Sequence, residues 1–126
     1  MSDVAEVARL AHDYLAAWSV AEPEEIAALH SPGSYFQVHD GSEPALGRGA
    51  VSARLRELFD RWEIFTFETN RLLLGQGHWV FDWTLVAVRS DGASPSAPQR
   101  LRCLDVVTVA NDGLIDRRDT YLGLRK

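Results

Sequence analysis

An aspartate near the end of the chain stands in the middle of an apolar stretch. Residues 100–109 alternate in polarity with a period of two, which predicts a β-strand. The face that contains Asp105 also carries Leu101, Cys103, Val107 and Val109. An ionised carboxylate is costly there without donors, whereas a protonated one can donate a hydrogen bond to a developing oxyanion. Asp105 is therefore either a cavity acid or a structural carboxylate bonded to backbone amides or to an arginine such as Arg118.

Other side chains could add proton chemistry to such a cavity. Tyr14 lies at the edge of the apolar stripe of an N-terminal helix, where its hydroxyl would meet either a ligand or a backbone partner. His39 and Asp40 are adjacent and could form an acid/base pair at a pocket mouth. The four histidines lack the spacing of a metal site, the single cysteine cannot build a metal cluster, and no phosphate-binding loop is present. We expect neither a metal nor an organic cofactor.

The elements that would position these residues follow from the apolar periodicity. Apolar residues at a spacing of three and four predict helices over residues 3–20, from Pro23 to the Ser31-Pro32-Gly33 stop, and over about 49–62. Alternating polarity predicts strands over residues 34–39, 64–74, 79–88, 100–109 and 114–122. Early helices and late antiparallel strands are typical of an α+β fold. We expect one domain over residues 1–126, in which three N-terminal helices pack on a curved, mostly antiparallel sheet around a cone-shaped hollow.

Composition excludes several classes of protein. A chain of 126 residues with 46% hydrophobic residues fits one globular domain. A net charge of −5 argues against a nucleic-acid surface or a polybasic membrane patch. The N-terminus resembles no signal peptide, and no apolar run approaches the ~20 residues of a membrane span. We expect a cytoplasmic protein that binds neither nucleic acid nor membrane.

Three stretches of sequence carry a family resemblance. They are residues 14–17 with the Pro-led helix and residues 26–29, residues 41–47, and residues 104–107 continued through 111–122. Together they span most of the chain, which resembles the NTF2-like superfamily, in particular its ketosteroid isomerase-like and SnoaL-like members. The resemblance implies a cone-shaped fold, a homodimer, and a cofactor-independent enzyme that moves a proton on an apolar ring compound bearing a carbonyl group, steroid-like or polyketide-like.

The resemblance also assigns roles to particular residues. Ketosteroid isomerases hold the substrate oxygen with a tyrosine and a protonated aspartate, and use a second aspartate as the base. The first two roles fall on Tyr14 and Asp105. An ungapped match places Val38 at the position of the base, so Asp40, two residues later on the same face, or His39 would move the proton. The pocket wall implied for the ligand comprises Trp18, Phe36, Val38, Phe59, Phe81, Trp83, Leu85, Arg118, Thr120 and Leu122.

Other superfamily members leave different chemistries open. SnoaL-like cyclases and limonene-epoxide hydrolases use an aspartate on the last strand, where Asp119 and Thr120 stand here. Scytalone dehydratase-like members use a His–Asp pair, for which His39, His78 and Asp105 are available. Asp82 is predicted to face outward, since the aromatic face of its strand is assigned to the cavity by the resemblance. A non-catalytic binding protein and an interaction domain with a filled hollow remain the other two hypotheses.

Overall fold

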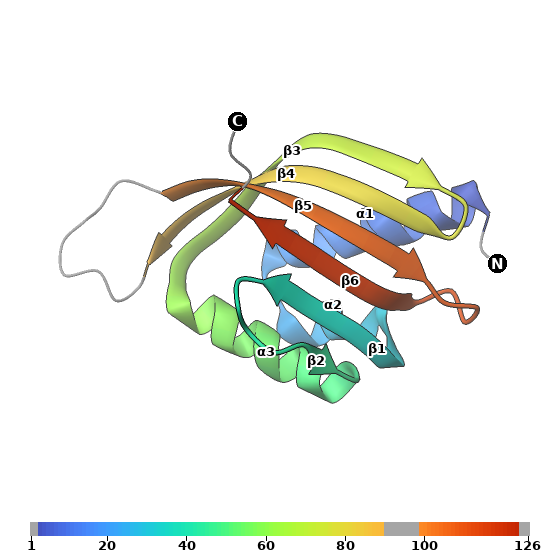
Figure 1. Cartoon of the computed structure of the whole chain (residues 1–126), viewed down its shortest axis with the longest axis horizontal. Helices are drawn as coiled ribbons and strands as arrows, with labels where there is room; N and C mark the ends of the chain where they lie inside the picture. The colour runs from blue at the N-terminus through green and yellow to red at the C-terminus, as the bar shows by residue number, and fades with distance from the viewer. Residues whose placement is uncertain (1–2, 90–98, 124–126) are drawn as a thin grey trace.

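The computed structural model describes residues 3–89 and 99–123 and has an α+β architecture (Figure 1). Its helices are α1 (Val4–Val20), α2 (Pro23–Ala28) and α3 (Arg48–Arg61). Its strands are β1 (His30–His39), β2 (Ala45–Leu46), β3 (Trp62–Gly75), β4 (His78–Arg89), β5 (Gln99–Val109) and β6 (Ile115–Leu122). None of the helices in these two ranges is long and apolar enough to cross a membrane.

The strands form one curved sheet in the order β2-β1-β6-β5-β4-β3. Neighbouring strands are antiparallel, except that β1 runs parallel to β6. Figure 1 shows α1 passing behind the strands and α3 running along the edge formed by β1 and β2. The predicted fold class, helices on a curved and mostly antiparallel sheet, is confirmed.

Local sequence explains why α1 begins where it does and which face it buries. The carboxylate of Asp3 accepts a hydrogen bond from the Glu6 amide at 2.8 Å, and the Glu6 side chain turns back to the Asp3 amide, which forms a capping box. Tyr14 and Trp18 are four residues apart, so they lie on the same face of the helix, and both are buried against the sheet.

The region after the second helix and one short strand differ from the sequence prediction. The helix predicted to run to the Ser31-Pro32-Gly33 stop ends at Ala28. The strand predicted from residue 34 begins at His30, and a register shift against β6 between His30 and Tyr35 accommodates the Ser31-Pro32-Gly33 segment. The short strand β2, which pairs with Tyr35 and Phe36, was not predicted. Two residues are too short to show any alternation in the sequence.

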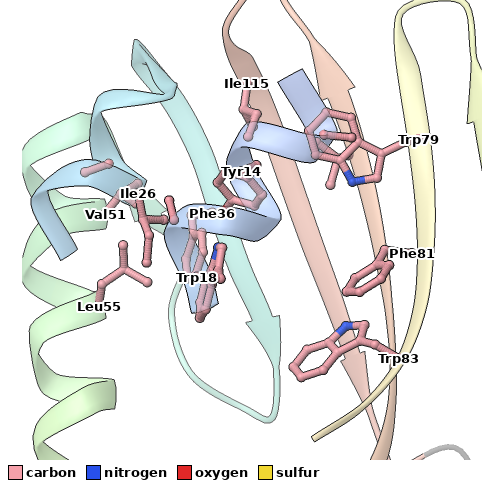
Figure 2. Close-up of a cluster of buried hydrophobic side chains, with 14 of the residues drawn as sticks. Tyr14, Trp18, Ile26, Phe36, Val51, Leu55, Trp79, Phe81, Trp83 and Ile115 are labelled. Atoms are coloured by element: carbon pink, nitrogen blue, oxygen red, sulfur yellow. The ribbon is translucent and has the colours of Figure 1, made fainter. Parts of the chain in front are cut away.

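The predicted division of β4 and β5 into two faces is confirmed. Trp79, Phe81 and Trp83 are at most 5% exposed on the helix-covered side, and Cys103, Asp105 and Val107 are equally buried on β5. Figure 2 shows the three β4 aromatic rings facing Tyr14 and Trp18 of α1. The sheet thereby contributes an aromatic wall, and α1 supplies the rings opposite to it.

Candidate functional site

A pocket of about 140 Å³ opens between the helices and the inner face of the sheet. Its wall contains most of the pocket residues expected from the sequence, namely Trp18, Phe36, Val38, Trp83, Leu85, Arg118, Thr120 and Leu122. The structure adds Asp40, Leu58, Arg61, Trp62, Phe65 and Leu101 to this wall. Leu58 lies in α3, and Trp62 is the first residue of β3. Both belong to the apolar stripe of the helix predicted over about residues 49–62, and this stripe was the signal that could have placed them in the pocket.

A second, much smaller void lies beside this pocket and shares part of its wall. It measures about 10 Å³ and borders Tyr14, Phe81 and Asp105. Trp18, Phe65, Trp83 and Arg118 line both spaces. Phe59, also expected in the wall, instead packs behind it, with its ring 5.6 Å from that of Trp18 and 5.3 Å from that of Phe65. The aromatic pocket therefore adjoins a small void whose wall is also largely aromatic and includes the charged pair Asp105 and Arg118.

Asp105 is part of a buried ion pair with Arg118. The Arg118 Nη2 donates to one carboxylate oxygen at 2.9 Å, and the Thr120 hydroxyl donates to the other at 2.7 Å. All three residues are at most 4% exposed. Burial by itself would lower the pKa of Arg118, but the facing carboxylate outweighs it and raises that pKa above its usual value. Of the two interpretations of Asp105, this geometry matches the carboxylate paired with Arg118.

Tyr14 is held by a different buried network. Its hydroxyl lies 2.9 Å from the Nε2 of His30, whose Nδ1 lies 3.2 Å from the Ser34 hydroxyl. Burial raises the pKa of Tyr14 to about 12 and lowers the pKa of His30 to about 3, so both groups are neutral near pH 7. Tyr14 and Asp105 thus border the same void but take different hydrogen-bond partners. Sequence reasoning missed His30 because a single histidine after a short helix carries no local signal.

The structure separates the adjacent residues Asp40 and His39. Asp40 lies at the pocket mouth, where it accepts hydrogen bonds from the hydroxyl of Ser42 at 2.5 Å and its amide at 3.0 Å. The bond from the Ser42 hydroxyl lowers the pKa of Asp40. His39 lies outside the pocket, with its Nε2 2.9 Å from Asp119 and its ring stacked on Tyr121 at 4.3 Å. His39 is the last residue of β1 and Asp40 begins the following turn; Val38, on the opposite face of the strand from His39, lines the pocket together with Asp40.

The outer face of the sheet carries the other two aspartates considered in the sequence analysis, Asp82 and Asp119. Asp82 accepts hydrogen bonds from Arg102 at 2.8 and 3.2 Å and from Asn70 at 3.2 Å, and the bonds from Arg102 are the main reason that its pKa falls to about 2. Burial alone would raise the pKa of Asp119, but bonds from Arg117 and His39 hold it below its usual value. Asp82 faces outward as predicted, and Asp119 shares that face. The homodimer expected from the resemblance stays a prediction.

The residues that the structure describes form neither a metal-binding cluster nor a reactive thiol site. Among these residues, no cluster of three or more histidine, cysteine or acidic side chains could hold a metal ion. Cys103 is buried, and desolvation raises the pKa of its thiol to about 12, which makes it a poor nucleophile.

Comparison with known protein families shows which family the chain belongs to. The model of the SnoaL-like domain matches residues 11–118, a range that runs from α1 into β6. It includes the buried ion pair and all of the pocket wall except Thr120 and Leu122. The chain belongs to the SnoaL-like domain family. It is thereby a member of the NTF2-like superfamily, as the sequence resemblance indicated. No curated protein matched the chain in a sequence comparison.

Solved structures of distant proteins support the same fold. A protein with a ketosteroid isomerase-like fold from Catenulispora acidiphila DSM 44928, in complex with trimethylamine, is similar at a TM-score of 0.79 and 13% identity, over 91% of this chain and 85% of that one. A ketosteroid isomerase-like protein from Erwinia carotovora atroseptica SCRI1043 is similar at 0.69 and 14%, over 97% of each chain. An NTF-2 like protein of unknown function from Burkholderia xenovorans LB400 is similar at 0.74 and 12%, over 96% and 85%. At such identities the likeness concerns the fold alone.

Proposed function

We propose that this SnoaL-like protein binds a compact, apolar, ring-containing small molecule in the pocket between α1, α3 and the inner face of the sheet. The observation that carries the proposal is the aromatic-walled pocket of about 140 Å³, whose wall includes Trp18, Phe36, Trp62 and Trp83. Apolar rings are held well by such walls because aromatic surface is removed from water on both partners.

Pocket size supports a small ligand. Pockets for drug-sized molecules usually measure about 300–1,000 Å³, and an apolar cavity of about 150 Å³ can hold a single benzene. The aromatic-walled volume, about 140 Å³, suits one ring. An adjoining space of about 360 Å³ at the mouth lets a second ring extend outward, but its wall includes the charged residues Asp40, Glu43 and Arg54. An apolar compound of one or two rings therefore fits better than a four-ring steroid skeleton, which would extend far into this charged mouth.

Pairing of the buried polar groups supports binding without catalysis. Asp105 is neutralised by Arg118, and Tyr14 is engaged with His30, so neither acidic group is free to take up the role that the family resemblance assigns to it. This arrangement favours the binding-protein hypothesis over an isomerase built on Tyr14 and Asp105.

The test is a binding titration with naphthalene and with pyrene, a four-ring compound, followed by calorimetry or ligand-observed NMR. Naphthalene is expected to bind and pyrene to bind at least tenfold more weakly. Leu58→Trp fills the pocket wall and should abolish binding, whereas Ala53→Trp on the exposed side of the same helix should leave it intact. Absence of naphthalene binding, or equal binding by Leu58→Trp, would refute the proposal.

A second candidate, proton transfer on a bound carbonyl compound, is favoured by the position of Asp40. This carboxylate is the titratable acid in the wall of the main pocket, and its lowered pKa keeps it ionised and able to accept a proton at neutral pH. A lowered pKa also makes it a weak base, so any transfer would be slow. Exchange of the α-protons of 2-acetonaphthone in D₂O would detect it by NMR. Exchange above the buffer rate that disappears in Asp40→Asn would support catalysis, and exchange at the buffer rate would exclude it for this ketone.

A further inference from the structure

One oxygen of the Asp40 carboxylate, at the mouth of the main pocket, has no partner among the described residues. Both hydrogen bonds that Ser42 donates to this carboxylate, from its amide at 3.0 Å and from its hydroxyl at 2.5 Å, end on Oδ1. No other residue in the described ranges donates a hydrogen bond to Oδ2. Asp40 is exposed, so a ligand in the pocket can reach this oxygen from the solvent side.

The pocket separates this carboxylate from the buried cation Arg118. Asp40 lines the pocket and the adjoining space at the mouth, whereas Arg118 lines the pocket and the small void. The void and the space at the mouth share no described residue in their walls, so they open off different parts of the pocket. Arg118 is 4% exposed and is paired with Asp105 at 2.9 Å. A positive group at the mouth therefore meets Asp40 and not the Arg118 guanidinium.

The aromatic wall between these two charges suits a cationic ligand better than an anionic one. The face of an aromatic ring is negative and attracts a cation within about 6 Å of its centre. Trp18 and Phe36 already hold the Arg118 guanidinium in this way, at 4.7 and 5.1 Å from their ring centres. Figure 2 shows these two rings next to each other, with Trp83 across from them. A carboxylate would be repelled by the same ring faces.

Acidic side chains outnumber basic ones around the mouth. Its wall contains three carboxylates and two guanidinium groups, which belong to Asp40, Glu43, Glu57, Arg54 and Arg61. The pKa of Asp40 is lowered mainly by the Ser42 hydroxyl and least by Arg54, so the Arg54 guanidinium does not occupy this carboxylate. The whole chain carries a net charge of −5. Both the local charges and the long-range field therefore favour the approach of a cation.

We propose that the mouth of the pocket is a subsite for the protonated amine of an arylalkyl amine, whose ring packs against Trp18, Phe36 and Trp83 while its ammonium group donates a hydrogen bond to Asp40. The inference rests on the proposed binding function and names the class of its ligand. The ring occupies the aromatic volume of about 140 Å³, and the ammonium group stays at the water-exposed mouth, where only part of its hydration is lost. Asp40 thereby selects the ligand by its charge.

Three naphthalene derivatives of similar shape test this assignment. They are 2-(aminomethyl)naphthalene, which is protonated at pH 7, 2-ethylnaphthalene, which replaces the ammonium group by a methyl group, and 2-naphthylacetate, which carries a negative charge. Calorimetry or ligand-observed NMR should show that the amine binds about threefold to tenfold more tightly than the hydrocarbon. The carboxylate should bind more weakly than either. The preference for the amine should shrink in 1 M salt, because the mouth is exposed.

Asp40→Asn keeps the shape of the side chain and removes its charge. It should abolish the preference for the amine over the hydrocarbon, while the affinity for 2-ethylnaphthalene changes less than twofold. Asp116→Asn is the matched control, because Asp116 is exposed on β6 and lies outside the walls of the pocket and the mouth. This variant removes the same charge from the chain and should leave the preference for the amine unchanged.

Each outcome has one meaning. Equal binding of the amine and the hydrocarbon, or an undiminished preference in Asp40→Asn, would overturn the ammonium subsite while leaving the binding function intact. Tightest binding by 2-naphthylacetate would show that the arginines at the mouth select an anion, and it would also overturn the inference. If neither naphthalene nor any of the three derivatives binds, the proposed function itself fails, and the subsite fails with it.

Discussion

Both faces of the sheet contain a nearly buried aspartate held by arginine, yet the two pairs sit in very different surroundings. Asp105 on the inner face and Asp82 on the outer face are each 3% exposed. The side chain of Arg118, the partner of Asp105, is 4% exposed, whereas those of Arg102 and Arg71, the partners of Asp82, are 51% and 64% exposed. The inner charges are stabilised by each other and by the Thr120 hydroxyl, whereas water shares in stabilising the outer ones.

Aromatic rings around the inner ion pair add to the difference between the inner and outer pairs. The Arg118 guanidinium lies 4.7 Å from the ring centre of Trp18 and 5.1 Å from that of Phe36. These rings exclude water from the inner pair. A buried ion pair of this kind contributes little net stability over an apolar pair, but the loss of one partner leaves a buried charge alone. The comparison therefore predicts large single-mutant effects inside the sheet and small ones outside it.

The largest effect is expected from Arg118→Met. Removal of the guanidinium leaves the Asp105 carboxylate with Thr120 as its remaining partner, and the free energy of unfolding should fall by about 3–5 kcal/mol. Urea denaturation followed by tryptophan fluorescence measures the loss. The double variant Arg118→Met with Asp105→Leu removes both charges and should recover much of the stability. A single variant as stable as the wild type would show that Asp105 is not ionised in the fold.

The next largest effect on the free energy of unfolding is expected when the pH is lowered, because of the buried residue His30. Burial lowers the pKa of His30 to about 3 from its ordinary 6.5. Between pH 6.5 and pH 3, His30 is protonated in the unfolded chain but stays neutral in the folded chain. The contribution of neutral His30 to the free energy of unfolding is therefore complete above pH 6.5 and declines as the pH falls to 3. The slope should reach about 1.4 kcal/mol per pH unit.

Denaturation midpoints measured between pH 7 and pH 4 check this expectation. The variant His30→Gln cannot take up the proton and should show a flatter pH profile, even though its stability at pH 7 is lower. An identical slope in wild type and His30→Gln would contradict the assignment of the pH dependence to His30.

The smallest effect is expected from Arg102→Met on the outer face. Arg71 and Asn70 continue to bond Asp82, and water can reach the site, so the loss of stability should be well below that of Arg118→Met. The difference from wild type should shrink further in 1 M salt, which screens exposed charges. Because the Arg102 bonds lower the pKa of Asp82 to about 2, their contribution is present above the unfolded-state pKa of 3.8 and is lost as the pH falls toward 2. A loss as large as that of Arg118→Met would remove the distinction between the two faces.

The sequence predicted most of the residues of the pocket wall but not the hydrogen-bond partners of its polar groups. Alternation along β4 put Trp83 and Leu85 on one face, and the family resemblance assigned that face to the cavity. The helical stripe put Trp18 beside Tyr14. Each of these placements depends on neighbours within a few residues in the chain. Asp40 was expected at the pocket mouth and lies in the pocket wall, whereas the burial of His30 could not be read in this way, because it depends on how β1 packs against α1 and β6.

The sequence by itself determined which side chains share a face, because a strand alternates every second residue: Asp105 shares a face with Cys103 and Val107, and Asp82 lies on the face opposite to Phe81 and Trp83. Tertiary structure alone decided the partners. The register that sets Thr120 opposite Asp105 brings Arg118 within 2.9 Å of the same carboxylate, and the packing of α1 on β1 joins Tyr14 to His30. Alternation is a local property of the backbone, whereas a hydrogen-bond partner is chosen among residues that only the folded sheet and helices bring together.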